Sequence, residues 1–181
     1  CNGKFIDKNS KIRNNNITYL DTASTSQKPN SVIESITNFY QNSYENVHRG
    51  MNSLSIDATE IFEASREKIK NFINAKSSNE IIFTKNATEG TNIIAHAMSS
   101  LLNDGDEIIT TELEHHSNFL PWLSLCKNKN LKFKVIPLLP NGTIKEEDVI
   151  NAISSSTKLV AISHMSNVTG QMIDVKKIKT S

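Results

Sequence analysis

The chain has 181 residues, of which 37% are hydrophobic, and its 20 Lys and Arg against 19 Asp and Glu leave a net charge of +1. This length indicates one domain, or one domain and a piece of another. A nearly neutral chain offers no basic surface for nucleic acid or for an anionic membrane, and no apolar run approaches the roughly 18 residues of a membrane-spanning helix. We therefore expect neither nucleic acid nor membrane as a partner.

The first half of the chain predicts a mobile arm and two helices. Residues 1–16 are polar and unpatterned, which is typical of a flexible terminus. Residues 17–20 alternate enough to indicate a short strand. Apolar residues then recur at helical spacing over residues 29–42 and 54–73. The segment between these two helices, N-V-H-R-G at residues 46–50, predicts a loop with a turn glycine.

From residue 80 onward the sequence alternates four short strands with three helices. The strands are expected at residues 80–84, 107–110, 131–137 and 158–163, and the helices at residues 86–102, 119–128 and 144–153. The strand segments are β-branched runs without polar alternation, as expected when both faces are covered. Right-handed crossovers then give an α/β fold, a mainly parallel sheet with helices on both faces.

The two cysteines, Cys1 and Cys126, are too few for a disulfide framework or a zinc cluster. Cys126 lies beside Leu125 in a predicted helix, so we expect a buried structural thiol. The absence of disulfides suits a reducing compartment. The chain starts without an initiator Met and stops in a stretch that resembles the start of a helix. We expect a fragment or a processed product.

Polar clusters follow three of the predicted strands, where an open α/β sheet places its ligand crevice. The first, Asn86-Ala87-Thr88-Glu89, opens a helix, where free N–H groups and the helix dipole favour an anion. From this stretch alone a simpler interpretation is favoured, in which Asn86 or Thr88 only caps the helix. The sequence leaves both the anion site and the simple helix cap open.

The other two clusters contain histidines: Glu114-His115-His116-Ser117-Asn118, and His164 with Ser166, Asn167 and Gly170. Adjacent histidines do not converge easily on one ion, and neither H-x-x-x-H nor C-x-x-C spacing is present, so we expect no metal site. The alternative is a planar phosphorylated ligand. Its phosphate would lie on the helix start, its ring under a histidine, and its polar edge against Asn167.

Five motifs in a fixed order give the chain a family resemblance. They are Y-L-D-T-A-S-T-S-Q-K-P (residues 19–29), N-V-H-R-G (46–50), T-K-N-A-T-E-G-T-N (84–92), G-D-E-I-I-T-T-E-L-E-H-H-S-N-F-L-P-W (105–122) and S-H-M-S-N-V-T-G (163–170). This order closely resembles the SUF-type cysteine desulfurases. These are fold-type I enzymes of the class V aminotransferase family that use pyridoxal 5′-phosphate (PLP).

The resemblance implies which residues would bind the cofactor. His115 would stack on the pyridine ring of PLP and is the one catalytic candidate in this sequence. Thr88 and the backbone around Ala87 would bind the phosphate. Asn167 would hydrogen-bond the phenolic oxygen of the ring. Many SUF-type members have Gly-Thr-Thr where this chain has Asn86-Ala87-Thr88; since Asn tolerates a left-handed backbone, we expect the phosphate site to be intact.

The substrate side of the resemblance concerns the second motif. His48 would lie near the substrate cysteine, in a segment that also approaches the partner of a homodimer. Arg49 fits the same motif, and its role is left open between the interface and simple loop packing. His116 and His164 receive no role.

By the same resemblance, the complete enzyme would convert L-cysteine to L-alanine. It would leave a persulfide that supplies a sulfur-acceptor protein of the SUF system for iron–sulfur cluster assembly. The family's Schiff-base lysine, active-site cysteine and C-terminal small domain have no counterpart in this sequence. Residues 17–181 would then be the N-terminal part of the PLP-binding large domain, inactive alone.

Two questions stay open from the sequence. The first is the reaction, since a selenocysteine lyase or a cysteine sulfinate desulfinase of the same family, or a non-catalytic scaffold piece of the PLP fold, are alternatives. The second is location. SUF systems and an Asn-, Lys- and Ile-rich composition favour a plastid (apicoplast-like) compartment or the cytoplasm.

Overall fold

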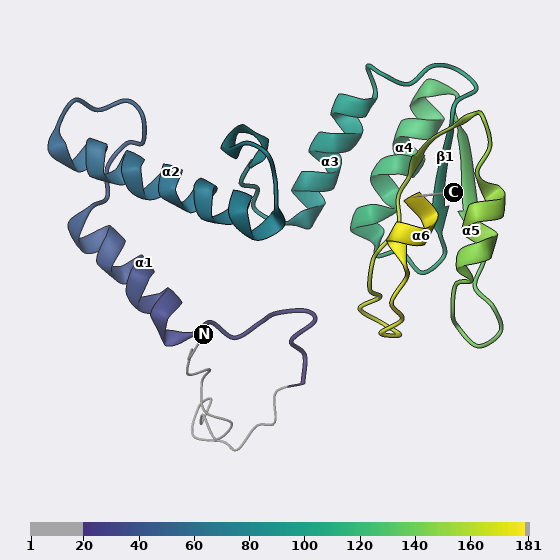
Figure 1. Ribbon diagram of the computed structural model, residues 1–181, viewed down its shortest axis with the longest axis horizontal. Coiled ribbons are helices and arrows are strands. Elements are labelled where there is room, and N and C mark those ends of the chain that lie inside the picture. Colours follow the sequence, from purple (N-terminus) through teal and green to yellow (C-terminus); the bar gives the residue numbers. More distant parts are fainter. Residues whose placement is uncertain (1–19, 180–181) are drawn as a thin grey trace. The chain divides into compact units, whose positions relative to one another are not determined.

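The computed structural model describes residues 20–179. The described chain divides into two compact units, one up to residue 82 and one from residue 83 onward, and Figure 1 labels their helices and the strand β1. The predicted arm and most of the predicted first strand lie outside the described residues; Leu20, the one described residue of that strand, is not in a strand. Within residues 20–179, no helix combines the length and the apolar character needed to cross a bilayer.

The first unit contains both helices that the apolar spacing predicts: α1 (Asn30–Asn42) and α2 (Ser53–Ile73), followed by the 3-10 turn η1 (Ser78–Glu80). The side chain of Asn52 caps α2 by accepting a hydrogen bond from the Ser55 N–H. Helix α1 buries no residue. The apolar side chains of both helices therefore stay largely open within the described chain, namely Val32, Ile33, Ile36, Tyr40, Leu54, Ile56, Ile61, Ile69 and Phe72.

The N-V-H-R-G segment is a tight turn held against the start of α2. The buried Ser55 hydroxyl donates to the Asn46 carbonyl (2.6 Å) and accepts from the Gly50 N–H (2.9 Å). A Cβ at Gly50 would lie 2.3 Å from the Ser55 Cβ, a distance that no real contact allows. The absence of a side chain at Gly50 is therefore what lets the turn close on the helix.

The second unit is built on a three-stranded parallel sheet in the order β2-β1-β3. Its elements are α3 (Ala87–Met98), β1 (Glu107–Thr111), η2 (His116–Asn118), α4 (Leu120–Lys129), β2 (Lys132–Ile136), α5 (Glu146–Ala152), β3 (Thr157–Val160) and α6 (Val175–Lys179). Every residue of the central strand β1 is buried. Its hydroxyls are satisfied there, since Thr110 Oγ1 donates to the Ala161 carbonyl (2.9 Å).

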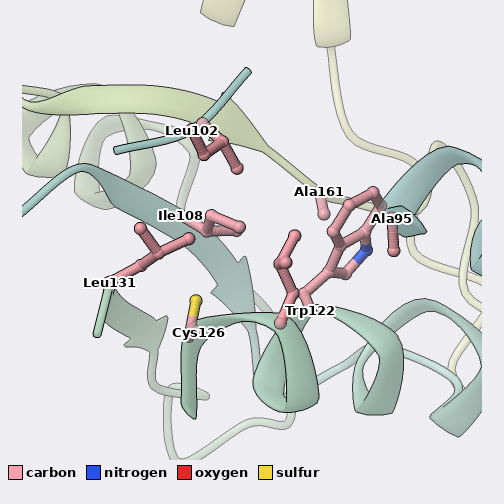
Figure 2. Packing of buried hydrophobic residues seen from close by; sticks show 8 residues of the cluster. Ala95, Leu102, Ile108, Trp122, Cys126, Leu131 and Ala161 are labelled. Carbon is pink, nitrogen blue, oxygen red and sulfur yellow. The ribbon is translucent and has the colours of Figure 1, made fainter. Parts of the chain in front are cut away.

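Helices cover both faces of this sheet, as the α/β prediction requires. On one face, Ile108 of β1 packs with Trp122 and Cys126 of α4 and Ala95 of α3, and Figure 2 shows these side chains converging between the helix and the strand. On the other face, Ile109 packs in a second cluster with residues of α5 and α6: Val149, Ala152 and Ile178. Adjacent residues of one strand thus belong to opposite cores.

One predicted strand is wrong. Residues 81–84 are β-branched or aromatic, yet Glu80 ends η1 and residues 81–84 form no strand; the Ile82 side chain is 74% exposed. No neighbouring strand pairs with this segment among residues 20–179. Because β-propensity measures fit to a paired, half-buried surface, it does not make a strand without a partner.

Two further predictions are corrected in detail. Strand β2 does show polar alternation, with Lys132 and Lys134 exposed, because it lies at an edge of the sheet rather than at its centre. Helix α3 ends at Met98 instead of near residue 102. The hydroxyls of Ser99 and Ser100 bond back to the carbonyls of the last turn (2.6 and 2.9 Å) and compete with further helix.

Substituting Gly50→Ala tests the closure of the first-unit turn. The new methyl group overlaps Ser55, so we expect a loss of about 1–3 kcal/mol in the free energy of unfolding, measured by urea titration. Gly90→Ala is the matched control. Its Cβ would meet only Thr84 Oγ1 at 3.6 Å, and a helical Gly→Ala change gains up to ~1 kcal/mol. Equal effects of the two substitutions would refute the close packing at Gly50.

The Cys126 thiol gives a second test. It is 3% exposed, and burial raises its pKa to about 11. The folded chain therefore keeps the thiol protonated until the pH rises through that value. We expect alkylation by iodoacetamide at about pH 8 to be roughly a hundredfold slower in the folded chain than in denaturant, measured at the Cys126 peptide by mass spectrometry. Equal rates would show that the thiol is accessible and not structural.

Candidate functional site

The start of α3 is closed by a reciprocal pair of side-chain caps. Asn86 Oδ1 accepts from the Glu89 N–H (2.9 Å), and Glu89 Oε2 accepts from the Lys85 N–H (2.6 Å). The capping interpretation of Asn86 is therefore correct. These caps leave the backbone N–H groups of Ala87 and Thr88 without a helical acceptor. The first hydrogen bond of the helix runs from the Gly90 N–H to the Asn86 carbonyl, two residues further on.

Thr88 adds a hydroxyl beside these N–H groups. Within residues 20–179 this hydroxyl has no hydrogen-bond partner, whereas the hydroxyl of Thr91, one turn on, donates to the Ala87 carbonyl (3.0 Å). A helix start with unused N–H groups and a free hydroxyl suits an anion. The anion and cap interpretations are therefore compatible, since they use different atoms.

His115 stands at the other side of the site, four residues beyond the end of β1. Its Nδ1 accepts from the Ser117 N–H (3.1 Å) and lies 2.8 Å from Ser117 Oγ. Because a backbone N–H can only donate, Nδ1 carries no proton in this arrangement, and the neutral ring has its proton on Nε2. The His115 ring is exposed and held in one orientation.

One pocket of about 430 Å³ contains both the helix start and this ring. It is lined by Thr88, Asn92, His115, His116, Ser117, Leu120, Pro121 and Ser124, from α3, η2 and α4. The structure thus brings together Thr88 and His115, which are 27 positions apart in the sequence. Ala87 is not among the lining residues, so the structure gives it no contact with the pocket, and the role of its backbone stays a prediction.

A carboxylate beside the pocket has a part that the sequence did not reveal. Glu114 Oε1 accepts from Thr111 Oγ1 (3.1 Å) and the Ser163 N–H (2.9 Å). Glu114 Oε2 accepts from Ser163 Oγ and Asn118 Nδ2, both at 2.7 Å. Asn118 Oδ1 in turn accepts from Trp122 Nε1 (3.2 Å). The only signal in the sequence is the i, i+4 spacing of Glu114 and Asn118.

Asn167 lies on a turn after β3. The buried Ser166 accepts through Oγ from the N–H groups of Val168 and Thr169 (3.2 Å each), and Gly170 ends the turn with a φ of +73°. Asn167 is exposed and does not line the pocket of Thr88 and His115. The structure therefore gives Asn167 no contact with that pocket, and its role stays a prediction.

His116 and His164, both in the second unit, differ in their surroundings. His116 lines the pocket and also a neighbouring one with Glu112, Glu114, Phe119 and Val135, while His164 lines neither. Among residues 20–179, no group of three or more His, Cys, Asp or Glu side chains is arranged to hold a metal ion.

His48 and Arg49 belong to the first unit. His48 has a φ of +67°, an uncommon conformation for a residue with a side chain. The chain is held there by a bond from the His48 N–H to Thr59 Oγ1 (2.9 Å), and His48 Nε2 lies 3.1 Å from Glu63 Oε1. Arg49 is exposed. The turn thus fixes the His48 ring, while Arg49 extends to solvent.

Known proteins resemble this chain over most of its length. A probable cysteine desulfurase of Halalkalibacterium halodurans is 45% identical over 169 residues, 93% of this chain but only 42% of that protein. The cysteine desulfurase of Thermococcus onnurineus NA1, solved in its apo form, has a TM-score of 0.84 and 37% identity, covering 90% of this chain and 40% of its own.

A more distant structure shows the fold alone. The cystine C–S lyase C-DES, solved as a mutant with glycine linked to its PLP cofactor, has a TM-score of 0.78 and 21% identity, covering 96% of this chain and 44% of its own. The parallel sheet with its helices thus matches structures of PLP fold type I. The family described as Aminotransferase class-V matches residues 18–181, and the chain belongs to that family.

Proposed function

We propose that the complete protein is a PLP-dependent cysteine desulfurase that converts L-cysteine to L-alanine. The chain spans about two fifths of the length of the relatives named above, and the activity is proposed for the complete protein. The observation that carries the proposal is the single pocket lined by Thr88 and His115. The resemblance to cysteine desulfurases assigns these two residues to the two ends of one cofactor.

The pocket has groups that fit both ends of PLP. The N–H groups of Ala87 and Thr88 precede the first helical bond, and the Thr88 hydroxyl beside them is unused within the described chain. These donors and the helix dipole stabilise a phosphate. The flat imidazole of His115, held by Ser117 on its Nδ1 side, offers a face for an aromatic ring.

The division of work follows from these positions. When bound, PLP supplies an electron sink for a carbanion at the substrate's α-carbon. Thr88 anchors the phosphate, and His115 orients the ring while keeping a proton on Nε2. The resemblance assigns His48 a place near the substrate cysteine, and its ring Nε2 lies 3.1 Å from Glu63 Oε1.

The finer proposals rest on the motifs at residues 46–50 and 105–122. These motifs favour the SUF-type branch, hence a homodimer that passes sulfur to an acceptor protein for iron–sulfur cluster assembly, in a plastid or the cytoplasm. Arg49 belongs to the segment expected near the dimer partner, and its exposure suits that position.

The cofactor site is tested by Thr88→Val in the complete protein. Losing a hydrogen bond to a charged phosphate weakens PLP affinity by about tenfold or more, measured by titrating the PLP-free protein and following cofactor absorbance. Thr91→Val is the matched control, because Thr91 lies on the same helix but does not line the pocket. His115→Phe keeps an aromatic face and retains more affinity than His115→Ala.

The reaction is tested by assaying alanine formed from cysteine. Competition with selenocysteine and cysteine sulfinate ranks kcat/KM for the three substrates, and cysteine is expected to rank first. If the complete protein shows no cofactor band and forms no alanine, the proposal is overturned. A higher kcat/KM for selenocysteine or cysteine sulfinate would assign it to another reaction of the same family.

A further inference from the structure

We propose that Glu114 is the positioning residue of the cofactor site: it holds the His115 ring and the segment leading to Asn167 in place. This proposal rests on the proposed function, because it assumes that the pocket binds PLP. Glu114 does not line that pocket and is not expected to touch the cofactor. Its effect is transmitted through the backbone on either side.

The carboxylate joins three separate segments. Thr111 ends the central strand, Asn118 ends η2, and Ser163 lies just beyond β3; all three donate to Glu114. The carboxylate accepts four hydrogen bonds, about the number that its two oxygens can hold. Because Ser163 is 49 residues away in the sequence, Glu114 connects the loops after two neighbouring parallel strands.

The orientation of the Asn118 amide is determined by Trp122. The Trp122 indole N–H can only donate, so Asn118 must present Oδ1 to it. The Nδ2 group of Asn118 then points at residue 114, which has to accept there. The Ser163 backbone N–H likewise requires an acceptor at Oε1. A glutamine at this position satisfies Ser163 but places its own NH₂ against that of Asn118.

Glu114 affects the pocket through the residues next to it and next to its partner Asn118 in the sequence. His115 is the next residue after Glu114, and its ring is held through Ser117, which precedes Asn118. Both ends of the segment that carries the ring are therefore tied to one carboxylate. Ser163 opens the segment that ends in the turn of Asn167. A shift of the carboxylate moves the imidazole and that turn together.

A second carboxylate provides a contrast. Glu107, buried at the opposite end of β1, accepts from Thr157 Oγ1 (2.6 Å) at the start of β3. This pair also ties β1 to β3, but no residue of the cofactor pocket is adjacent to it. Thr157→Val therefore removes a side-chain hydrogen bond between the same two strands without changing a residue next to the candidate site. Its effect on PLP affinity shows how much a general loosening of the sheet contributes.

The experiment exchanges the two partners in the complete protein. Glu114→Gln alone should weaken PLP affinity by about tenfold, since it sets two donors against each other. Asn118→Asp alone sets two carboxylates face to face and should weaken it at least as much. The double variant E114Q/N118D restores the donor–acceptor pair between residues 114 and 118 with the same net charge, and the Ser163 hydroxyl then accepts from the new NH₂ instead of donating to it. It should recover wild-type affinity to within a few-fold, while Thr157→Val leaves affinity unchanged.

A second readout needs no cofactor. With ¹⁵N-labelled histidine in the PLP-free protein, the wild-type His115 imidazole is expected as a single Nε2–H tautomer. Glu114→Gln should give averaged nitrogen shifts, and the double variant should return the wild-type signal. If the double variant is no better than either single variant, or if Thr157→Val lowers affinity as much as Glu114→Gln, the proposal is overturned. If wild type binds no PLP, the proposed function fails, and the tautomer alone decides whether Glu114 holds His115.

Discussion

Strand β1 is paired with a strand on each edge and covered by helices on each face. Its register and its orientation within the second unit are therefore both determined by its neighbours. Ile108 is buried in one core and Ile109 in the other, so a slip by one residue would exchange the two cores. The strand therefore delivers residues 112–118 to one defined place at its carboxyl end. The candidate site depends on that constraint, because the segment that carries His115 begins where the strand ends.

The polar network around Glu114 extends this rigidity into the loops. Loops usually lie at the low-stability end of a structure, but here the buried Trp122 and Thr111 both reach the same hydrogen-bonded cluster. The pocket is thus formed by a helix start and a ring whose support comes from core residues. Hydrogen bonds from residues that do not touch the ligand keep a binding side chain in the geometry that binding requires.

Sequence patterns pointed to Thr88 and His115 separately, but not to the pocket that both residues line. The helix start at Asn86 was readable because capping residues have a local mechanism, and the histidine pair followed a buried apolar strand. Neither pattern shows that Thr88 and His115 share a pocket, since that depends on the contact of α3 with η2 and α4. No local pattern marks Glu114, because three of its four hydrogen-bond donors belong to Thr111 and Ser163, outside the loop of residues 112–118.

What the sequence by itself determined were the elements whose causes are local: α1 and α2 from apolar periodicity, β1 from a continuous buried run, and the turn of His48 and Gly50 from its glycine. What only the tertiary structure decided were features that need a partner. Residues 80–84 have the composition of a strand and form none, because β-structure requires a neighbouring strand to complete its hydrogen bonds. The meeting of Glu114 with Ser163 across two parallel strands has the same origin, since sheet order, and not sequence distance, sets which loops become neighbours.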